Sequence, residues 1–175
     1  MKNTVADQSV GIPITYAHGI REQVKLGPKI SKQVKRKLRL VARIVQGGGM
    51  QRVFRQLFNV GPDEKLLKVS QCHLFTTAGP IAGLLFISTE KLAFSSERSL
   101  RFTTSTGEFI RVPYKVFIPL KKIKRAAPSV NVNNPREKYI KIVTVDNFDF
   151  WFVGLVNYKK SFKHIQQAIC QSSMR

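Results

Sequence analysis

The spacing of apolar residues changes near residue 62 and divides the chain into a helical part and a β part. Over 28–46, apolar residues recur at helical spacing, and Pro28 suits a first helical turn. One stripe of this predicted helix is apolar: Ile30, Val34, Leu38, Val41 and Val45. Its other side is basic: Lys32, Lys35, Arg36, Arg39 and Arg43. Residues 1–25 show no sustained periodicity and are predicted to form a flexible arm.

A shorter helical stretch follows Gly47-Gly48-Gly49, which we expect to end the first helix. Its apolar face consists of Val53, Phe54, Leu57 and Phe58, and Gly61-Pro62 ends it. The helical region is therefore predicted over 26–60. It precedes a separate domain over 61–172.

After Pro62, apolar and polar residues alternate, which is typical of strands. Strands are predicted over 66–74, 81–88, 91–96, 109–118, 120–125, 138–145 and 148–154. Pro113 favours an edge strand or a bend, and Asp146-Asn147 suits a tight hairpin turn. Asn157 is placed to cap a final helix. The apolar stripe of that helix is Tyr158, Phe162, Ile165 and Ile169, opposite Lys159, Lys160 and Lys163.

This order of elements predicts one mainly β domain. With no alternation of strands and helices, the strands are expected to be antiparallel. They would form a bent sandwich or a partly open barrel of about seven strands, closed by the C-terminal helix. Pleckstrin-homology-like domains have the same order.

The charge of the chain predicts binding to polyanions. The formal net charge is +20. Residues 1–62 hold 12 Lys and Arg against two acids, and residues 63–175 hold 18 against eight, so each part carries +10. Nucleic acid, anionic lipid headgroups and acidic proteins would all be attracted. Lys121, Lys122, Lys124 and Arg125 form a second basic cluster, which also has the form of a nuclear-localisation tract and equally suits an ordinary exposed strand.

Catalytic, metal-binding and cofactor-binding residues are not expected. Cys72 and Cys170 are too few for a zinc site or a disulfide framework. His18, His73 and His164 lack partners at catalytic spacing, and Gly47-Gly48-Gly49 lacks the ending of a phosphate-binding loop. The N-terminus resembles neither a signal peptide nor a myristoylation site, and the apolar stretch 79–87 is too short to span a membrane. An intracellular location is expected.

The segment from Glu64 to Arg98 resembles the GRAM domain of plant GEM-like, abscisic-acid-responsive proteins. The resemblance continues at 112–116, 118–120 and 158–161, and the stretch 28–46 is similar to the upstream region of the same family. It implies a pleckstrin-homology-like fold without catalytic activity, acting near membranes or in protein complexes and linked to hormone and stress responses. GRAM domains also occur in myotubularin-type phosphatases, but Cys170 and Arg175 are one residue too close for their catalytic loop.

The ligand stays open among several polyanions. Phosphoinositide-binding pleckstrin domains carry cations in the first strand-to-strand loop, whereas 75–80 here has none. Arg98 and Arg101, expected in the loop after the third strand, are less specific substitutes. We therefore expect binding to anionic lipid headgroups or a protein partner, in the cytoplasm and at its membranes. The alternative is a nuclear or nucleic-acid-associated adaptor, although no aromatic RNA-binding motif is present.

Overall fold

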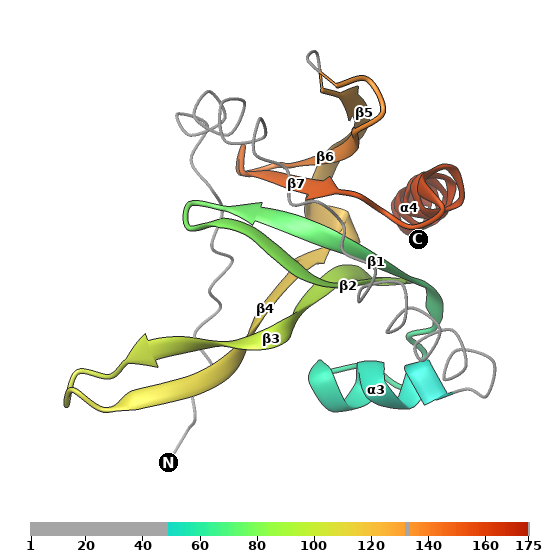
Figure 1. Ribbon diagram of the computed structural model, residues 1–175. Helices are drawn as coiled ribbons and strands as arrows, with labels where there is room; N and C mark the ends of the chain where they lie inside the picture. Colours follow the sequence, from blue (N-terminus) through green and yellow to red (C-terminus); the bar gives the residue numbers. More distant parts are fainter. Residues whose placement is uncertain (1–48, 132–133, 175) are drawn as a thin grey trace.

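The structure is a computed structural model that describes residues 49–131 and 134–174 (Figure 1). The helix predicted over 28–46, with its five cations, and the arm 1–25 lie outside these residues. The described elements are α3 (Gly49–Leu57), β1 (Leu66–Thr76), β2 (Gly79–Ser88), β3 (Lys91–Thr103), β4 (Phe109–Pro119), the 3-10 turn η3 (Leu120–Lys122), β5 (Ile123–Val130), β6 (Lys138–Thr144), β7 (Asp149–Val153) and α4 (Tyr158–Ser173).

The seven strands form one antiparallel sheet in the order β4-β3-β2-β1-β7-β6-β5. The non-consecutive pair is β1 with β7, where His73 lies opposite Val153 and Leu74 opposite Phe152. This pairing joins the two halves of the domain. β4 and β5 are left at the two edges of the sheet, connected by η3. The predicted fold class, mainly β with seven antiparallel strands and a C-terminal helix, is confirmed.

The two helices pack on opposite faces of the sheet. Neighbouring residues of β2 point to opposite faces, so this one strand contributes to the cores on both sides. Leu85 and Ile87 belong to the main core, to which α4 contributes Ile165 and Ala168. Phe86 points the other way and packs under α3. Figure 1 shows α3 and α4 separated by the sheet.

α4 confirms the predicted amphipathic helix. Ile165 is fully buried, and the side chains of Tyr158, Phe162 and Ile169 pack against the main core. The hydroxyls of Ser161 and Ser70 lie 2.6 Å apart and form a buried hydrogen bond between α4 and β1. The three lysines on the other side of the helix, Lys159, Lys160 and Lys163, are partly or fully exposed to solvent.

Several local predictions need correction. β3 continues to Thr103, past the predicted end at residue 96, because a bulge between Ser95 and Ser99 lets pairing with β4 resume. The strand predicted over 120–125 is instead the turn η3 followed by β5. Asn157 precedes α4 as expected, but with φ of 56° its side chain makes no capping hydrogen bond.

Two turn and edge predictions are confirmed. Pro113 lies in β4, an edge strand, next to the bulge and opposite Ser99. The β6–β7 connection is a hairpin turn in which Asn147 adopts a left-handed φ of 62° and donates its N–H to the carbonyl of Thr144 at 3.0 Å. Gly49 belongs to α3, so it begins this helix as well as following the one predicted upstream.

Candidate functional site

The distal part of the β3–β4 hairpin brings cations together from two strands. Arg101 lies directly opposite Arg111 in the strand register, and both are exposed. Arg98 is exposed in the bulge of β3. Arg98 and Arg101 were expected in a loop; both lie within β3, because the strand resumes after the bulge. The guanidinium of Arg101 lies 5.3 Å from the ring centre of Phe109, within the range of a cation–π contact.

The second basic cluster lies where the chain crosses between the two edges of the sheet. Lys121 and Lys122 are in η3, and Lys124 and Arg125 follow in β5; all four are exposed. Ile123 between them is buried and anchors the segment to the main core. No carboxylate in the part of the chain that the structure describes forms an ion pair with these four cations.

A further pair of cations was not predicted from the sequence. The pKa of Lys68, in β1, is lowered by burial and, to a smaller extent, by the positive charge of Lys160, in α4. No local pattern could have found the pair, because its members are far apart in the chain and interact only because α4 packs on the sheet.

Two buried carboxylates have structural roles. Glu64 lies 3.2 Å from the Nζ of Lys91 and accepts a hydrogen bond of 2.6 Å from the hydroxyl of Ser88. Asp149 lies 2.6 Å from the Nζ of Lys141. These acids compensate partly buried lysines. They therefore do not neutralise the exposed cations at the sheet edges.

The turn between β1 and β2 is held by its own polar groups. The Thr76 hydroxyl donates to the Gly79 carbonyl at 2.8 Å and accepts from the N–H of Ala78 at 3.2 Å. The two turn residues are Thr77 and Ala78, so no cation lies in the loop where phosphoinositide pockets of pleckstrin domains gather them. The sequence expectation for this loop agrees with the geometry.

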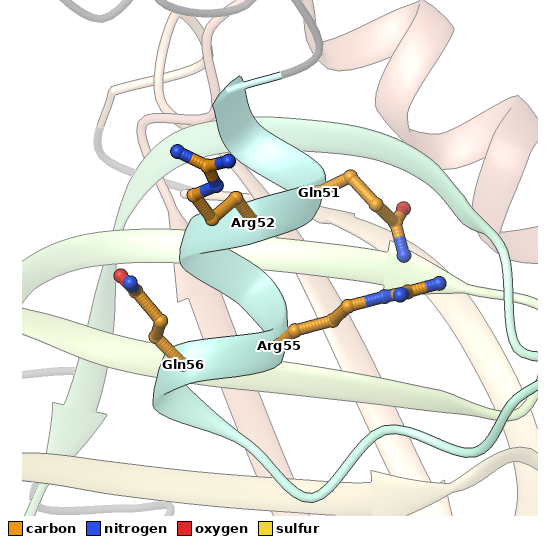
Figure 2. Close-up of a pocket in the computed structure, with 4 residues that line it drawn as sticks. All are labelled: Gln51, Arg52, Arg55 and Gln56. Atoms are coloured by element: carbon orange, nitrogen blue, oxygen red, sulfur yellow. The ribbon is translucent and has the colours of Figure 1, made fainter.

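α3 carries a small polar surface on its outer side. Its lining residues, Gln51, Arg52, Arg55 and Gln56, come from successive turns of the helix (Figure 2). The side-chain carbonyl of Gln51 accepts the N–H of Leu66 at 3.1 Å and ties α3 to β1. Arg52 and Arg55 are exposed. They were missed as candidates because the apolar face of this stretch dominated its interpretation.

The cysteines and histidines do not form a reactive cluster in the described residues. Cys72 is fully buried, and burial raises the pKa of its thiol far above the usual range. Burial lowers the pKa of His73, and the nearby Glu97 raises it to a smaller extent. His164 shares a 2.7 Å hydrogen bond with the carbonyl of Lys160. Over 49–131 and 134–174, no group of these residues is arranged to hold a metal ion.

No helix among the described residues has the length and apolar character needed to cross a membrane.

Comparison with known proteins agrees with this geometry. The family model of the GRAM domain matches residues 52–173, which include most of α3, the whole sheet and α4. The C-terminal domain of an unknown protein from Leishmania infantum has the same fold, with a TM-score of 0.51 and 18% sequence identity over 70% of this chain and 96% of that one. The match to the family model over most of the chain shows that it contains a GRAM domain.

Relatives in Arabidopsis thaliana narrow the family. GEM-like protein 4 is 52% identical over 90% of this chain and 71% of its own length. GEM-like protein 6 is 52% identical over 89% of this chain and 71% of its own length. GEM-like protein 1 is 37% identical over 85% of this chain and 57% of its own length. The chain belongs to the GEM-like family of GRAM-domain proteins, as the resemblance of Glu64–Arg98 indicated.

Proposed function

We propose that this chain is a non-enzymatic GRAM-domain adaptor that docks on anionic membranes in the cytoplasm, in the hormone- and stress-linked setting that the family resemblance implies. The observation that carries the proposal is the exposure of cations at both edges of the sheet. Arg101 and Arg111 lie near one edge, and the cluster of η3 and β5 lies at the other. Exposed cations attract anionic headgroups most strongly when no carboxylate of the same protein competes for them.

The physical gain is sufficient for peripheral binding. Each Lys or Arg near an anionic leaflet contributes about 1 kcal/mol, so several cations together can hold a protein at the surface. The attraction is screened by salt over a Debye length of about 10 Å at 0.1 M. Binding is therefore expected to weaken steadily as salt is raised.

The same geometry supports low headgroup specificity. Because the β1–β2 turn has no cation, we expect the chain to respond to membrane charge more than to a particular inositol phosphate. Vesicles matched in charge, one series with phosphatidylserine and one with a phosphoinositide, should bind it with similar affinity. A strong preference for one phosphoinositide at matched charge would contradict this part of the proposal.

Sedimentation with vesicles tests the main claim. The chain should bind vesicles of phosphatidylcholine with phosphatidylserine, and not phosphatidylcholine alone. Changing Lys121, Lys122 and Lys124 to Gln should weaken binding more than changing Lys159, Lys160 and Lys163, which removes the same charge from α4. Absence of binding to anionic vesicles at low salt would refute the proposal, and tight binding to duplex DNA in its place would favour the nucleic-acid alternative.

A further inference from the structure

The outer end of β4 exposes an apolar run, Phe109 to Pro113, which Arg111 interrupts. All five residues from Phe109 to Pro113 are exposed, and four of them are apolar. Phe109 is 68% exposed, Ile110 43% and Val112 40%. Isolated exposed apolar residues are ordinary, whereas a contiguous run marks an interaction surface.

This run is exposed because the helix that covers the main core does not extend to the end of the hairpin. Ile110 and Val112 continue the row of alternate β4 residues that includes Val116 and Ile118, both buried in the main core. α4 covers this face over β1, β2, β5 and η3, which leaves the distal hairpin outside its reach. Figure 1 shows the ends of β3 and β4 extending beyond the rest of the sheet. The row thus continues past the layer that would bury it.

The same hairpin carries opposed like charges. Arg101 and Arg111 face each other directly across the two strands, an arrangement that is unfavourable in an isolated sheet. In the residues that the structure describes, no carboxylate forms an ion pair with either. An external anion between or beside the two guanidiniums would relieve their repulsion. The charges and the apolar run therefore suit one surface that is anionic outside and apolar beneath.

We propose that the β3–β4 hairpin enters the boundary between headgroups and acyl chains of an anionic membrane along its β4 edge. Phe109 and Ile110 pass into the apolar boundary, and Arg101 and Arg111 bind lipid phosphates. The inference rests on the proposed membrane function and assigns the contact to one element. Arginine beside an aromatic ring suits this depth, because the guanidinium stays hydrated or phosphate-bound while the ring is buried.

A membrane explains this edge better than a partner strand does. Pro113 lacks an N–H, and proline on an edge strand discourages the addition of another strand. The arginine pair would also meet a polar protein backbone there in place of a phosphate. The lipid headgroups supply many mobile phosphates that can adapt to two closely spaced guanidiniums.

Paired substitutions test the apolar contribution. Phe109→Ser with Ile110→Ser should weaken partition onto phosphatidylcholine–phosphatidylserine vesicles by about tenfold or more, given the area of the two side chains. Val130→Ser with Val145→Ser is the matched control, because each of these valines is 54% exposed away from the hairpin tip. It should bind as the unchanged chain does. Arg101→Gln with Arg111→Gln should weaken binding and flatten its dependence on salt.

A fluorescent label tests insertion directly. Phe109→Cys in a Cys170→Ser background offers one reactive thiol among the described residues, because Cys72 is only 1% exposed. An environment-sensitive dye at residue 109 should shift to the blue on anionic vesicles and be quenched by brominated acyl chains. The same dye on Val145→Cys should show neither change.

The outcomes separate the two proposals. If the chain binds anionic vesicles while the label at 109 stays in water and the double serine variant binds normally, the hairpin inference is overturned and the proposed function stands. If the unchanged chain binds no anionic vesicle, both are overturned. If the double serine variant turns a dimer into a monomer without changing vesicle binding, the surface joins two copies of the chain and the inference is also overturned.

Discussion

Replacement of Phe54 by alanine should destabilise the whole GRAM domain. Phe54 lies at the centre of the contact between α3 and the sheet and is 0% exposed. Its ring stacks on Phe86 at 5.4 Å between centroids and lies 5.7 Å from Phe58. Lys115 of β4 completes the contact by donating to the carbonyl of Leu57 at 2.9 Å, the last residue of α3.

The expected loss is about 3–5 kcal/mol, the usual cost of removing a fully buried phenylalanine side chain. About 1.5–3 kcal/mol of this is the transfer of the side chain from water. The two ring contacts contribute about 0.5–1.5 kcal/mol each beyond buried area.

Unfolding in urea measures this loss. Trp151 is the one tryptophan of the chain and lies in β7, so its fluorescence reports the sheet and not α3 itself. Phe54→Ala should therefore lower the midpoint seen by Trp151. Gln56→Ala is the control: this exposed α3 residue should change the free energy of unfolding by less than about 0.5 kcal/mol.

A Trp151 transition that moves by less than about 1 kcal/mol in Phe54→Ala would refute the reasoning. It would mean that α3 unfolds on its own and is not part of the cooperative domain. Arg52 and Arg55 would then not be held by the fold.

Three further substitutions test other contacts. Gly83→Ala should lower the melting temperature, because its new Cβ would lie 2.3 Å from the backbone oxygen of Ser95, and such overpacking costs about 1–3 kcal/mol. Glu64→Gln should cost about 1–3 kcal/mol in urea unfolding, because the partly buried Lys91 loses its charged partner. Burial lowers the pKa of His73 in the folded chain. As pH falls through about 6.5, the unfolded chain therefore binds a proton at His73 before the folded chain does, and the free energy of unfolding should decrease from pH 7 towards 5. His73→Gln should reduce that decrease.

Each of these has a plain contrary result. An unchanged melting temperature for Gly83→Ala would mean that β2 and β3 shift apart at no cost. Unchanged stability of Glu64→Gln would show that the Asn59 carbonyl is a sufficient partner for the Lys91 ammonium, and that the Ser88 hydroxyl does not need a charged acceptor. An equal loss of stability at low pH with and without His73 would assign the acid sensitivity to other groups.

Much of the fold follows from residue patterns within single elements. Alternation in 109–118 predicted β4, and the stripe through Ile165 predicted the buried side of α4, because both periods are properties of local backbone geometry. The turn at Asp146-Asn147 was equally local, since these residues tolerate a left-handed backbone. The division of the chain into a helical region over 26–60 and a separate domain over 61–172 stays a prediction.

The misplaced boundaries share a tertiary cause. The sequence predicts that β3 ends at Ser96, because the bulge interrupts its alternation; only pairing with β4 shows that the strand resumes at Ser99. The sequence predicts a strand at Lys121 and Lys122, but the chain crosses there between the two edges of the sheet and forms a 3-10 turn. The left-handed backbone of Asn157 likewise depends on how α4 enters from β7.

Residue patterns alone predict a basic, mainly β chain that is closed by an amphipathic helix, and they single out most of the exposed cations. The packing of distant segments decided which cations act on one another: Arg101 lies opposite Arg111 through strand register, and the charge of Lys160 acts on Lys68 because α4 packs on the sheet. It also decided that the apolar run from Phe109 is uncovered. Alternation shows which side of a strand a residue faces, but the extent of the opposing layer depends on where distant segments end.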